Sequence, residues 1–167
     1  MFPKLGIADD RMRLSDDLRQ FIASPVMIII GTRDSANRPA VGRAVGARVV
    51  DAGTVEFLYS AWQWPETHRN LAANGEAALT FARPADYVAY QLKGNARLRA
   101  ATPADQALTS RYQADIHAMF AGLGLPAELV APWLADRELA AARLRVRELY
   151  VQTPGPSAGT RAGVPER

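Results

Sequence analysis

The segment GRAVGARVVDAGTVEFLYSAWQWPETHRN, from Gly42 to Asn70, carries the strongest signal in this chain. Most of it is strand-like and carries isolated arginines, and a Trp-rich turn then leads into a helix start with a Thr. An arginine presents a planar, always-charged fork that matches phosphate oxygens, and a helix N-terminus adds unpaired N–H groups. Arginines on neighbouring strands that converge with Ser and Thr at a helix start therefore predict a binding site for a dianionic phosphate.

The bulk properties indicate one globular domain. The 167 residues, of which 49% are hydrophobic, are enough to bury about two-thirds of the unfolded surface. Lys4 and Lys93 are the only lysines among 20 basic residues, which a general preference of the host for arginine would explain. The formal net charge of +3 is spread along the sequence without long basic blocks. We therefore expect no nucleic-acid partner.

Several kinds of site are excluded by residue type. Without cysteine there is no disulfide, thiolate nucleophile or Cys-based metal site. His68 and His117 are the only histidines, too few and too isolated for a His-cluster metal centre. Residues 1–14 lack an apolar targeting segment, and the longest apolar run, 26–30, is far too short to cross a bilayer. We expect a cytoplasmic protein with no metal site and no membrane association.

Hydrophobic periodicity and turn residues predict a mainly β chain. The expected strands span 26–32, 40–50, 54–60, 77–82, 87–98 and 143–153, and the expected helices 15–23, 65–74 and 103–120, with a further helical turn in 126–134. The segment 26–32, which is rich in β-branched and apolar residues, predicts a strand buried on both faces. Interior glycines such as Gly46 and Gly94 mark a bulge, a barrel bend or the close approach of a ligand. Hairpin spacing with helical insertions indicates an antiparallel barrel.

The order of these elements resembles the pyridoxamine-5′-phosphate-oxidase-like flavoproteins, the FMN-binding split β-barrels. The resemblance covers about residues 21–101, and the last strand fits the same plan. It is carried by Gly42-Arg43 with Arg48, by residues 57–60 followed by 67–71, by Asn74-Gly75 before AALTF, and by strand 88–98 with Gly94. It implies a six-stranded, antiparallel, Greek-key-like split β-barrel. A single FMN-binding domain would then span 1–153, with a helical insertion at about 103–134.

The resemblance also implies which residues contact the cofactor. In that family two basic residues five apart on the second strand reach the FMN, and Arg43 and Arg48 have this spacing. On a straight strand they would face opposite sides, and a bulge at Gly46 would bring both to one surface. Alternation leaves open whether Tyr90 or Gln91 faces the flavin, and Gln91 is our candidate. The other expected contacts are Tyr59, Ser60, Thr67, His68 and Arg69.

The implied function is that of a homodimeric FMN-dependent oxidoreductase, with the cofactor at the dimer interface and an unidentified small molecule as substrate. No catalytic acid or base is assigned. The ending TPGPSAGTR replaces the Trp- and Arg-bearing C-terminus of the vitamin B6 oxidases, so a vitamin B6 substrate is not assigned. The alternative is a non-enzymatic binding or sensor protein for flavin, haem or the deazaflavin F420. Residues 154–167 contain few large apolar groups and are expected to form a flexible tail.

Overall fold

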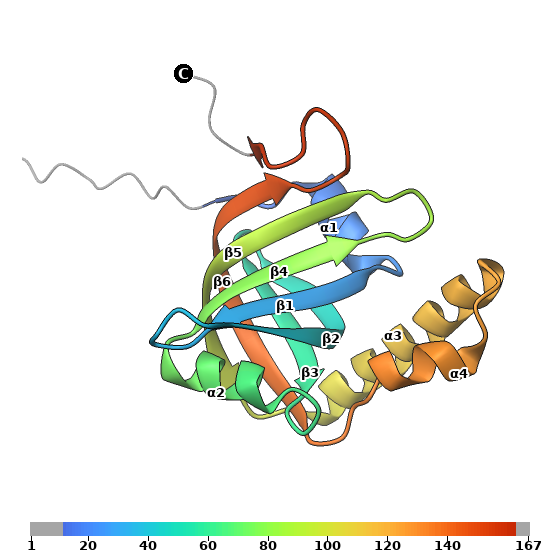
Figure 1. Cartoon of the computed structure of the whole chain (residues 1–167), viewed down its shortest axis with the longest axis horizontal. Coiled ribbons are helices and arrows are strands. Elements are labelled where there is room, and N and C mark those ends of the chain that lie inside the picture. Colours follow the sequence, from blue (N-terminus) through green and yellow to red (C-terminus); the bar gives the residue numbers. More distant parts are fainter. Residues whose placement is uncertain (1–11, 163–167) are drawn as a thin grey trace, which may run out of the picture.

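The structure, a computed structural model, describes residues 12–162, which form one β-barrel with helices at its ends and side (Figure 1). The expectations for residues 1–11 and 163–167 lie outside the described residues. The barrel strands are β1 Met27–Arg33, β2 Pro39–Asp51, β3 Thr54–Ser60, β4 Glu76–Ala82, β5 Ala89–Arg99 and β6 Leu139–Val151. They are ordered β3-β2-β1-β4-β5-β6, and pairing of β3 with β6 closes the sheet. The predicted six-stranded antiparallel barrel is confirmed.

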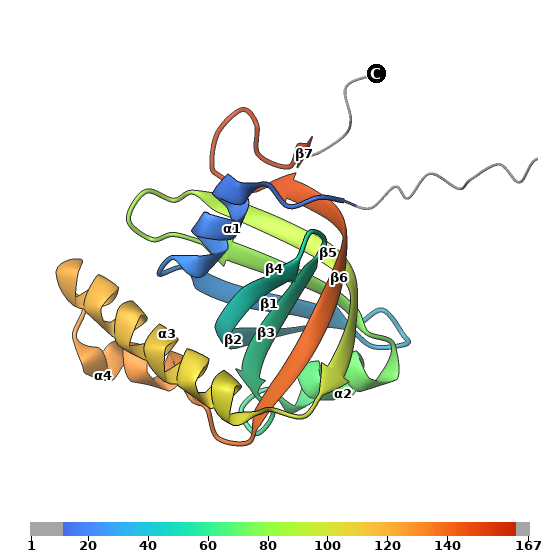
Figure 2. The ribbon, with the colours of Figure 1, turned by 180° about the vertical axis from the view of Figure 1, so that it is seen from behind.

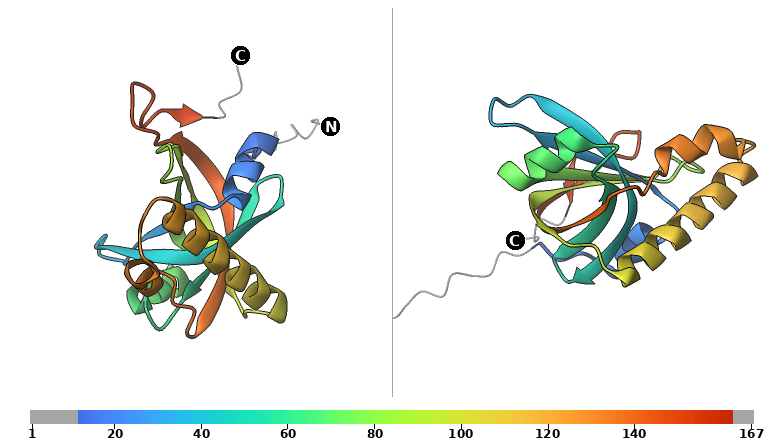
Figure 3. Two further views of the ribbon diagram at one scale, coloured as in Figure 1. Left: turned by 90° about the vertical axis from the view of Figure 1, so that its right-hand side faces the viewer. Right: turned by 90° about the horizontal axis from the view of Figure 1, so that it is seen from below.

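Helices lie at both ends of the barrel and along its side. They are α1 Asp16–Ala23, α2 Pro65–Ala73, α3 Pro103–Gly122 and α4 Ala127–Val130, followed by a 3₁₀ turn at Ala131–Trp133. α1 and α2 lie at opposite ends of the barrel (Figure 2), whereas α3 and α4 form an arm that extends beyond it (Figure 3). α3 begins with a capping box between Thr102 and Asp105, which satisfies its first amides. Within residues 12–162, no helix has the length and apolar character that crossing a membrane would require.

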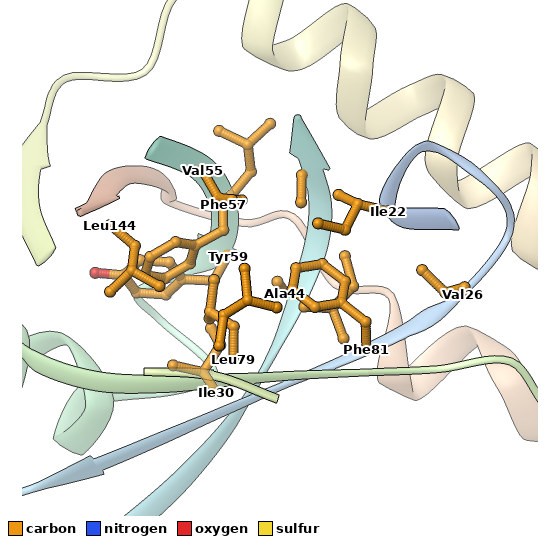
Figure 4. Packing of buried hydrophobic residues seen from close by; sticks show 14 of the residues in the cluster. Ile22, Val26, Ile30, Ala44, Val55, Phe57, Tyr59, Leu79, Phe81 and Leu144 are labelled. Carbon is orange, nitrogen blue, oxygen red and sulfur yellow. The ribbon is translucent and has the colours of Figure 1, made fainter. Parts of the chain in front are cut away.

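Alternate residues of the strands fill the interior of the barrel (Figure 4). Phe57 and Phe81 are 0% exposed, and Ile28 and Ile30 of β1 point into the same core. The expectation that this strand is buried on both faces is wrong, because Ile29 lies half-buried on the outer face. An antiparallel barrel gives each strand one core face and one outer face.

The glycine positions explain two irregularities in the barrel wall. The register of β2 on β3 shifts between Ala44 and Ala47, so a bulge forms around Gly46 as predicted. Because of this extra residue, Arg43 and Arg48 both project from the outer side of β2. A second shift lies between Lys93 and Gly94 where β5 pairs with β6.

The C-terminal segment, for which the sequence predicts a flexible tail, makes backbone pairs with the barrel in the part that the structure describes. Residues Arg161–Ala162 form a short strand, β7, that pairs with Leu149 and Tyr150 of β6. The amide of Val151 also donates to the carbonyl oxygen of Thr160 at 2.9 Å. The segment folds back because unpaired groups of β6 accept it, which composition alone does not reveal.

Candidate functional site

One row of side chains crosses five strands on the outer face of the barrel. The register pairs Arg43 of β2 with Ile29 of β1, and Ile29 with Thr80 of β4. It then pairs Thr80 with Gln91 of β5, and Gln91 with Tyr150 of β6. Directly opposed residues in antiparallel strands project from the same face. Two of the predicted cofactor contacts, Arg43 and Gln91, therefore lie on one face of the sheet.

Gln91 is the outward-facing member of the pair that the sequence left open. Its Nε2 donates to Thr80 Oγ1 at 2.9 Å, which fixes the amide against the sheet. Tyr90 instead packs on Phe21 of α1, with ring centroids 5.2 Å apart in an edge-to-face arrangement. The Gln91 carbonyl oxygen and its second N–H remain available to a flat ligand on the outer face.

Arg43 lies at the other end of this row, beneath the helical arm. Its guanidinium is 4.9 Å from the ring centroid of Trp133, which in turn packs edge-to-face on Phe120 at 5.7 Å. A cation–π contact of this kind orients the guanidinium without consuming its N–H donors. Arg43 is thus a half-buried cation that keeps donors available for an anion.

A shallow groove of ≈ 390 Å³ adjoins the row on the same face. Gly31 and Ala78 contribute to its floor, and because Gly31 has no side chain and Ala78 only a methyl group, little projects from the sheet surface there. Its charged lining residues are Arg33, Glu76, Lys93, Arg147 and Glu148. Lys93 Nζ lies 4.7 Å from the ring centroid of Tyr150, whose hydroxyl donates to Glu148. The outer face therefore combines a flat floor with fixed cations, which suits a planar anionic ligand.

Arg48 reaches the outer side of the barrel as predicted, but its guanidinium is already paired. It contacts Glu56 at 2.6 Å and Asp105 at 2.9 Å, and these two carboxylates are 3% and 0% exposed. Between Arg43 and Arg48, α3 packs over β2, since a Cβ built on Gly46 would lie 3.5 Å from Leu108. The helix separates the two arginines, so Arg48 does not join Arg43 at the outer-face row.

Glu56 and Asp105 are held ionised by the arginines around them. Burial alone would raise the pKa of Glu56, but hydrogen bonds from Arg99, Arg143 and Arg48 outweigh it and lower the pKa from 4.5 to about 2. The pKa of Asp105 is lowered chiefly by its hydrogen bonds with Arg99, against the opposing effect of burial. Ion pairs within this cluster hold α3 against the barrel wall. Its members are Arg48, Glu56, Arg99, Asp105 and Arg143.

The end of β3 and the turn after it are occupied by internal contacts. Tyr59 is 0% exposed, and its hydroxyl lies 2.8 Å from Nδ1 of His68. Burial raises the pKa of Tyr59. Ser60, also 0% exposed, donates to the carbonyl oxygen of Arg137 at 2.6 Å and accepts from the Gln63 amide at 3.1 Å. These predicted contacts are turned inward in the single chain.

The start of α2 does not open onto the outer-face row. A Cβ built on Gly42 would meet Thr67 Oγ1 and Trp64, so α2 packs on the side of β2 opposite to Arg43. Thr67 is 1% exposed. Arg69 is exposed and lies 3.8 Å from Glu66, within a separate groove at the β1–β2 hairpin. Arg43, Arg48 and Arg69 therefore face three different surroundings in one protomer.

Replacing Thr67 by valine is expected to stabilise the protein by about 1 kcal/mol, because a buried hydroxyl without a partner carries a desolvation cost. Among residues 12–162, Thr67 Oγ1 has no hydrogen-bond partner, and valine has nearly the same shape. Urea unfolding of Thr67→Val and of the parent checks this. A destabilised variant would show that the hydroxyl makes a bond, for example to a bound ligand in the purified protein.

Sequence reasoning did not identify Thr80, Tyr150, Lys93 and Trp133 as neighbours of the predicted contacts. Three of them reach the face through strand register, which a hydrophobic pattern does not specify by itself. Trp133 comes from the helical arm, far along the chain from Arg43. Knowledge of which strands pair, and in which register, would have identified Thr80, Tyr150 and Lys93. No local sequence pattern would have identified Trp133.

Comparison with known proteins places this geometry in a family. The family model described as pyridoxamine 5′-phosphate oxidase matches residues 14–151. Among curated proteins, none matches the sequence. Similar solved structures include a putative pyridoxamine 5′-phosphate oxidase from Lactobacillus delbrueckii, at 13% identity and TM-score 0.55, covering 87% of this chain and 98% of that one.

HupZ of Group A Streptococcus is also similar, at 14% identity and TM-score 0.53, covering 87% of this chain and 99% of that one. The haem storage protein HutZ of Vibrio cholerae shares 17% identity at TM-score 0.50, covering 84% and 95%. At such identities these structures support the fold alone, whereas the family model spans most of the chain. The chain therefore belongs to the pyridoxamine 5′-phosphate oxidase family.

Proposed function

We propose that this chain is an FMN-binding protein that holds the flavin on the outer face of β2, β1, β4 and β5 and acts as a flavin-dependent oxidoreductase on a small molecule. The observation that carries the proposal is the outer-face row, in which Arg43 and Gln91 flank a flat surface of Ile29 and Thr80. When bound, the flavin supplies the hydride chemistry. The chain would bind the flavin, orient it and exclude water from it.

The residues of this face fit a planar, anionic group. Arg43 would bind the phosphate through its N–H groups, and Gln91 would hydrogen-bond the polar edge of the ring. The flat surface formed with Gly31 and Ala78 would receive the apolar part of the ring. One guanidinium contributes about 1.5–3 kcal/mol to anion binding, whereas micromolar affinity needs about 8 kcal/mol, so ring burial and further contacts must supply the rest.

A second protomer would complete this site. A ring on an open sheet leaves one side in water, and the outer face carries Val41, 63% exposed, beside half-buried Ile29. Association through this face would bury both and enclose the ring. We therefore include the homodimer, with the cofactor between protomers, in the proposal. In that dimer, Arg69 or His68 of each chain remains a candidate contact.

Haem is supported less well than a flavin by the side chains of this face. A haem iron requires an axial ligand such as histidine. His68 lies at the opposite side of β2 with Nδ1 bonded to Tyr59, and His117 lies on α3. A deazaflavin would occupy the same flat surface as FMN and would be distinguished from it by its absorption spectrum.

The visible spectrum of the purified protein tests these alternatives. A flavin spectrum would support the proposal, a Soret band would favour haem, and a colourless protein would leave a deazaflavin or no cofactor.

Replacing Arg43 by alanine is expected to weaken FMN binding by about 10- to 100-fold, because one charge-assisted phosphate contact of about 1.5–3 kcal/mol is lost. Titration of the apo-protein with FMN, followed by flavin fluorescence, measures the change. Arg38→Ala is the matched control, since Arg38 is 81% exposed in the β1–β2 hairpin and pairs with Asp34. Equal affinity of both variants would contradict the site. Anaerobic reduction of the bound flavin by a nicotinamide donor separates an enzyme from a sensor.

A further inference from the structure

The outer side of β5 and β6 carries a second charged feature, which lies away from Arg43 and shares only Arg147 with the groove described above. The sequence RLRVR of β6 alternates Arg143, Arg145 and Arg147 on the outside with Leu144 and Val146 in the core. The core residues are 0% and 5% exposed, whereas all three arginines are exposed. Because alternate residues of a strand face the same side, the three arginines form a line of guanidiniums spaced about 7 Å apart.

The neighbouring strand extends this line. Arg97 of β5 lies directly opposite Arg143, and Arg99 lies opposite Ala141 in the same antiparallel pairing. We call the five side chains Arg97, Arg99, Arg143, Arg145 and Arg147 the arginine strip. It runs for about 20 Å along the strands, from the level of Arg99 to that of Arg147. The helices lie at the ends of the barrel and on the side of β2 (Figures 2 and 3), so β5 and β6 present this side to solvent.

Carboxylates beneath the strip fix several of its cations in place. Glu56 binds Arg99 and Arg143, and Asp105 binds Arg99, while both carboxylates stay buried. Arg147 lies 3.7 Å from Glu76. The surface therefore presents guanidiniums whose negative partners are largely below them. Fixed donors lose little conformational freedom when an anion binds.

Two members of the strip keep their full charge for a partner. Within residues 12–162, neither Arg97 nor Arg145 has a carboxylate within ion-pair distance, and both are exposed. The pKa of Asp51 is lowered chiefly by a hydrogen bond from the Gly53 amide, at 2.8 Å, and to a smaller extent by the charge of Arg145. The five arginines outnumber their carboxylate partners Glu56, Asp105 and Glu76, so the strip carries a net positive charge, although the charge is spread evenly along the sequence.

The surroundings of the strip favour a polyanion over a folded protein partner. Protein interfaces are built around a buried apolar or aromatic core. The exposed large hydrophobic residues of the described chain are Val41, Val50, Trp62, Tyr87, Leu123 and Leu129, and none lies on β5 or β6. Binding to phosphodiesters needs no such core, because the release of counterions supplies the affinity. Arginine also matches phosphate oxygens by its planar fork.

We propose that the arginine strip binds the phosphate backbone of a nucleic-acid duplex without sequence preference. A duplex is favoured over a single strand because the strip carries no exposed aromatic ring on which bases would stack. Sequence readout is not expected, because the strip is a flat sheet surface with no helix or ribbon projecting into a groove. This revises the expectation of no nucleic-acid partner, which rested on charge along the chain rather than on the folded surface.

The test is fluorescence anisotropy of a labelled 20-bp DNA duplex titrated with the full chain at 50 and 200 mM salt. With about four phosphates contacted, affinity is expected to fall about 100-fold between the two salt concentrations. The double variant Arg97→Gln/Arg145→Gln removes two cations, so the fall should shrink to about 10-fold, with weaker binding at low salt. The control Arg38→Gln/Arg111→Gln lowers the net charge equally, at exposed positions in the hairpin and on α3, and should retain the parental salt dependence.

Three results would overturn the proposal. The first is equal salt dependence in the strip variant and the control. The second is a difference of tenfold or more between two duplexes of unrelated sequence, since that requires base readout. The third is equally tight binding of polyglutamate of matched charge, which would assign the strip to acidic protein segments. Thermal unfolding of both variants confirms that a lost signal is not lost fold.

Discussion

Replacing Gly94 by alanine is expected to destabilise the barrel by about 4 kcal/mol or more, a large share of the 5–15 kcal/mol that holds a typical domain folded. A Cβ on Gly94 would overlap the carbonyl oxygen of Arg145 and lie 2.9 Å from its carbonyl carbon. These atoms belong to the backbone of β6, which cannot rotate aside as a side chain does. β5 and β6 would have to separate at the point where their register shifts.

Urea unfolding of Gly94→Ala beside Gly122→Ala measures this effect. A Cβ on Gly122, at the end of α3, would meet no atom of the described part of the chain within 4 Å, so that variant is expected to change stability by less than about 1 kcal/mol. If Gly94→Ala expresses poorly, circular dichroism of the refolded protein still distinguishes a loosened barrel from an unfolded chain. An unchanged unfolding midpoint would mean that β5 and β6 do not approach as closely as the structure places them.

Gly94 also illustrates which features the sequence could predict. Period-two alternation, turn residues and interior glycines identified the six strands and the bulge at Gly46, because these depend on neighbours along the chain. The interior Gly94 predicts a bulge, a barrel bend or the close approach of a ligand, and only the pairing with β6 shows that the backbone of Arg145 is the close neighbour. The local sequence pattern indicates a position where glycine is needed, and the strand topology shows which atoms a side chain there would meet.

The candidate site was predicted less completely, since its residues depend on distant partners. Arg48 is taken up by Asp105, which lies 57 positions away on a helix whose packing against β2 the sequence did not indicate. Thr67 has the residue type of a phosphate ligand, but the packing of α2 on Gly42 turns its hydroxyl inward. Arg43 and Gln91 share a face because three successive strand pairings align them. Spacing predicted the residue types, whereas register and helix packing decided which were available.

Replacing Glu56 by glutamine is expected to cost about 3 kcal/mol at about pH 7, because it removes a buried charge and leaves the guanidiniums around it without a partner. Glu56 Oε1 accepts from Arg99 at 3.0 Å and from Arg143 at 2.6 Å, and its other oxygen accepts from Arg48 at 2.8 Å. Glutamine keeps the size of the side chain but offers one acceptor and an N–H₂ group that faces donors. Glu66→Gln is the control, since Glu66 is 71% exposed and should change stability by less than about 0.5 kcal/mol.

The pH dependence separates this charge effect from a change of packing. The pKa of Glu56 is lowered from 4.5 to about 2 in the folded protein, so its contribution is fully present above its unfolded pKa. As the pH falls from about 4.5 to about 2, the carboxylate is protonated more readily in the unfolded chain than in the folded protein. About 3 kcal/mol of the free energy of unfolding is therefore lost across this window. Glu56→Gln lacks this group, so the stability difference between parent and variant should shrink across that window. A difference that stays constant from about pH 7 to about pH 3 would show that packing, rather than the ion-pair cluster, holds α3 to the barrel.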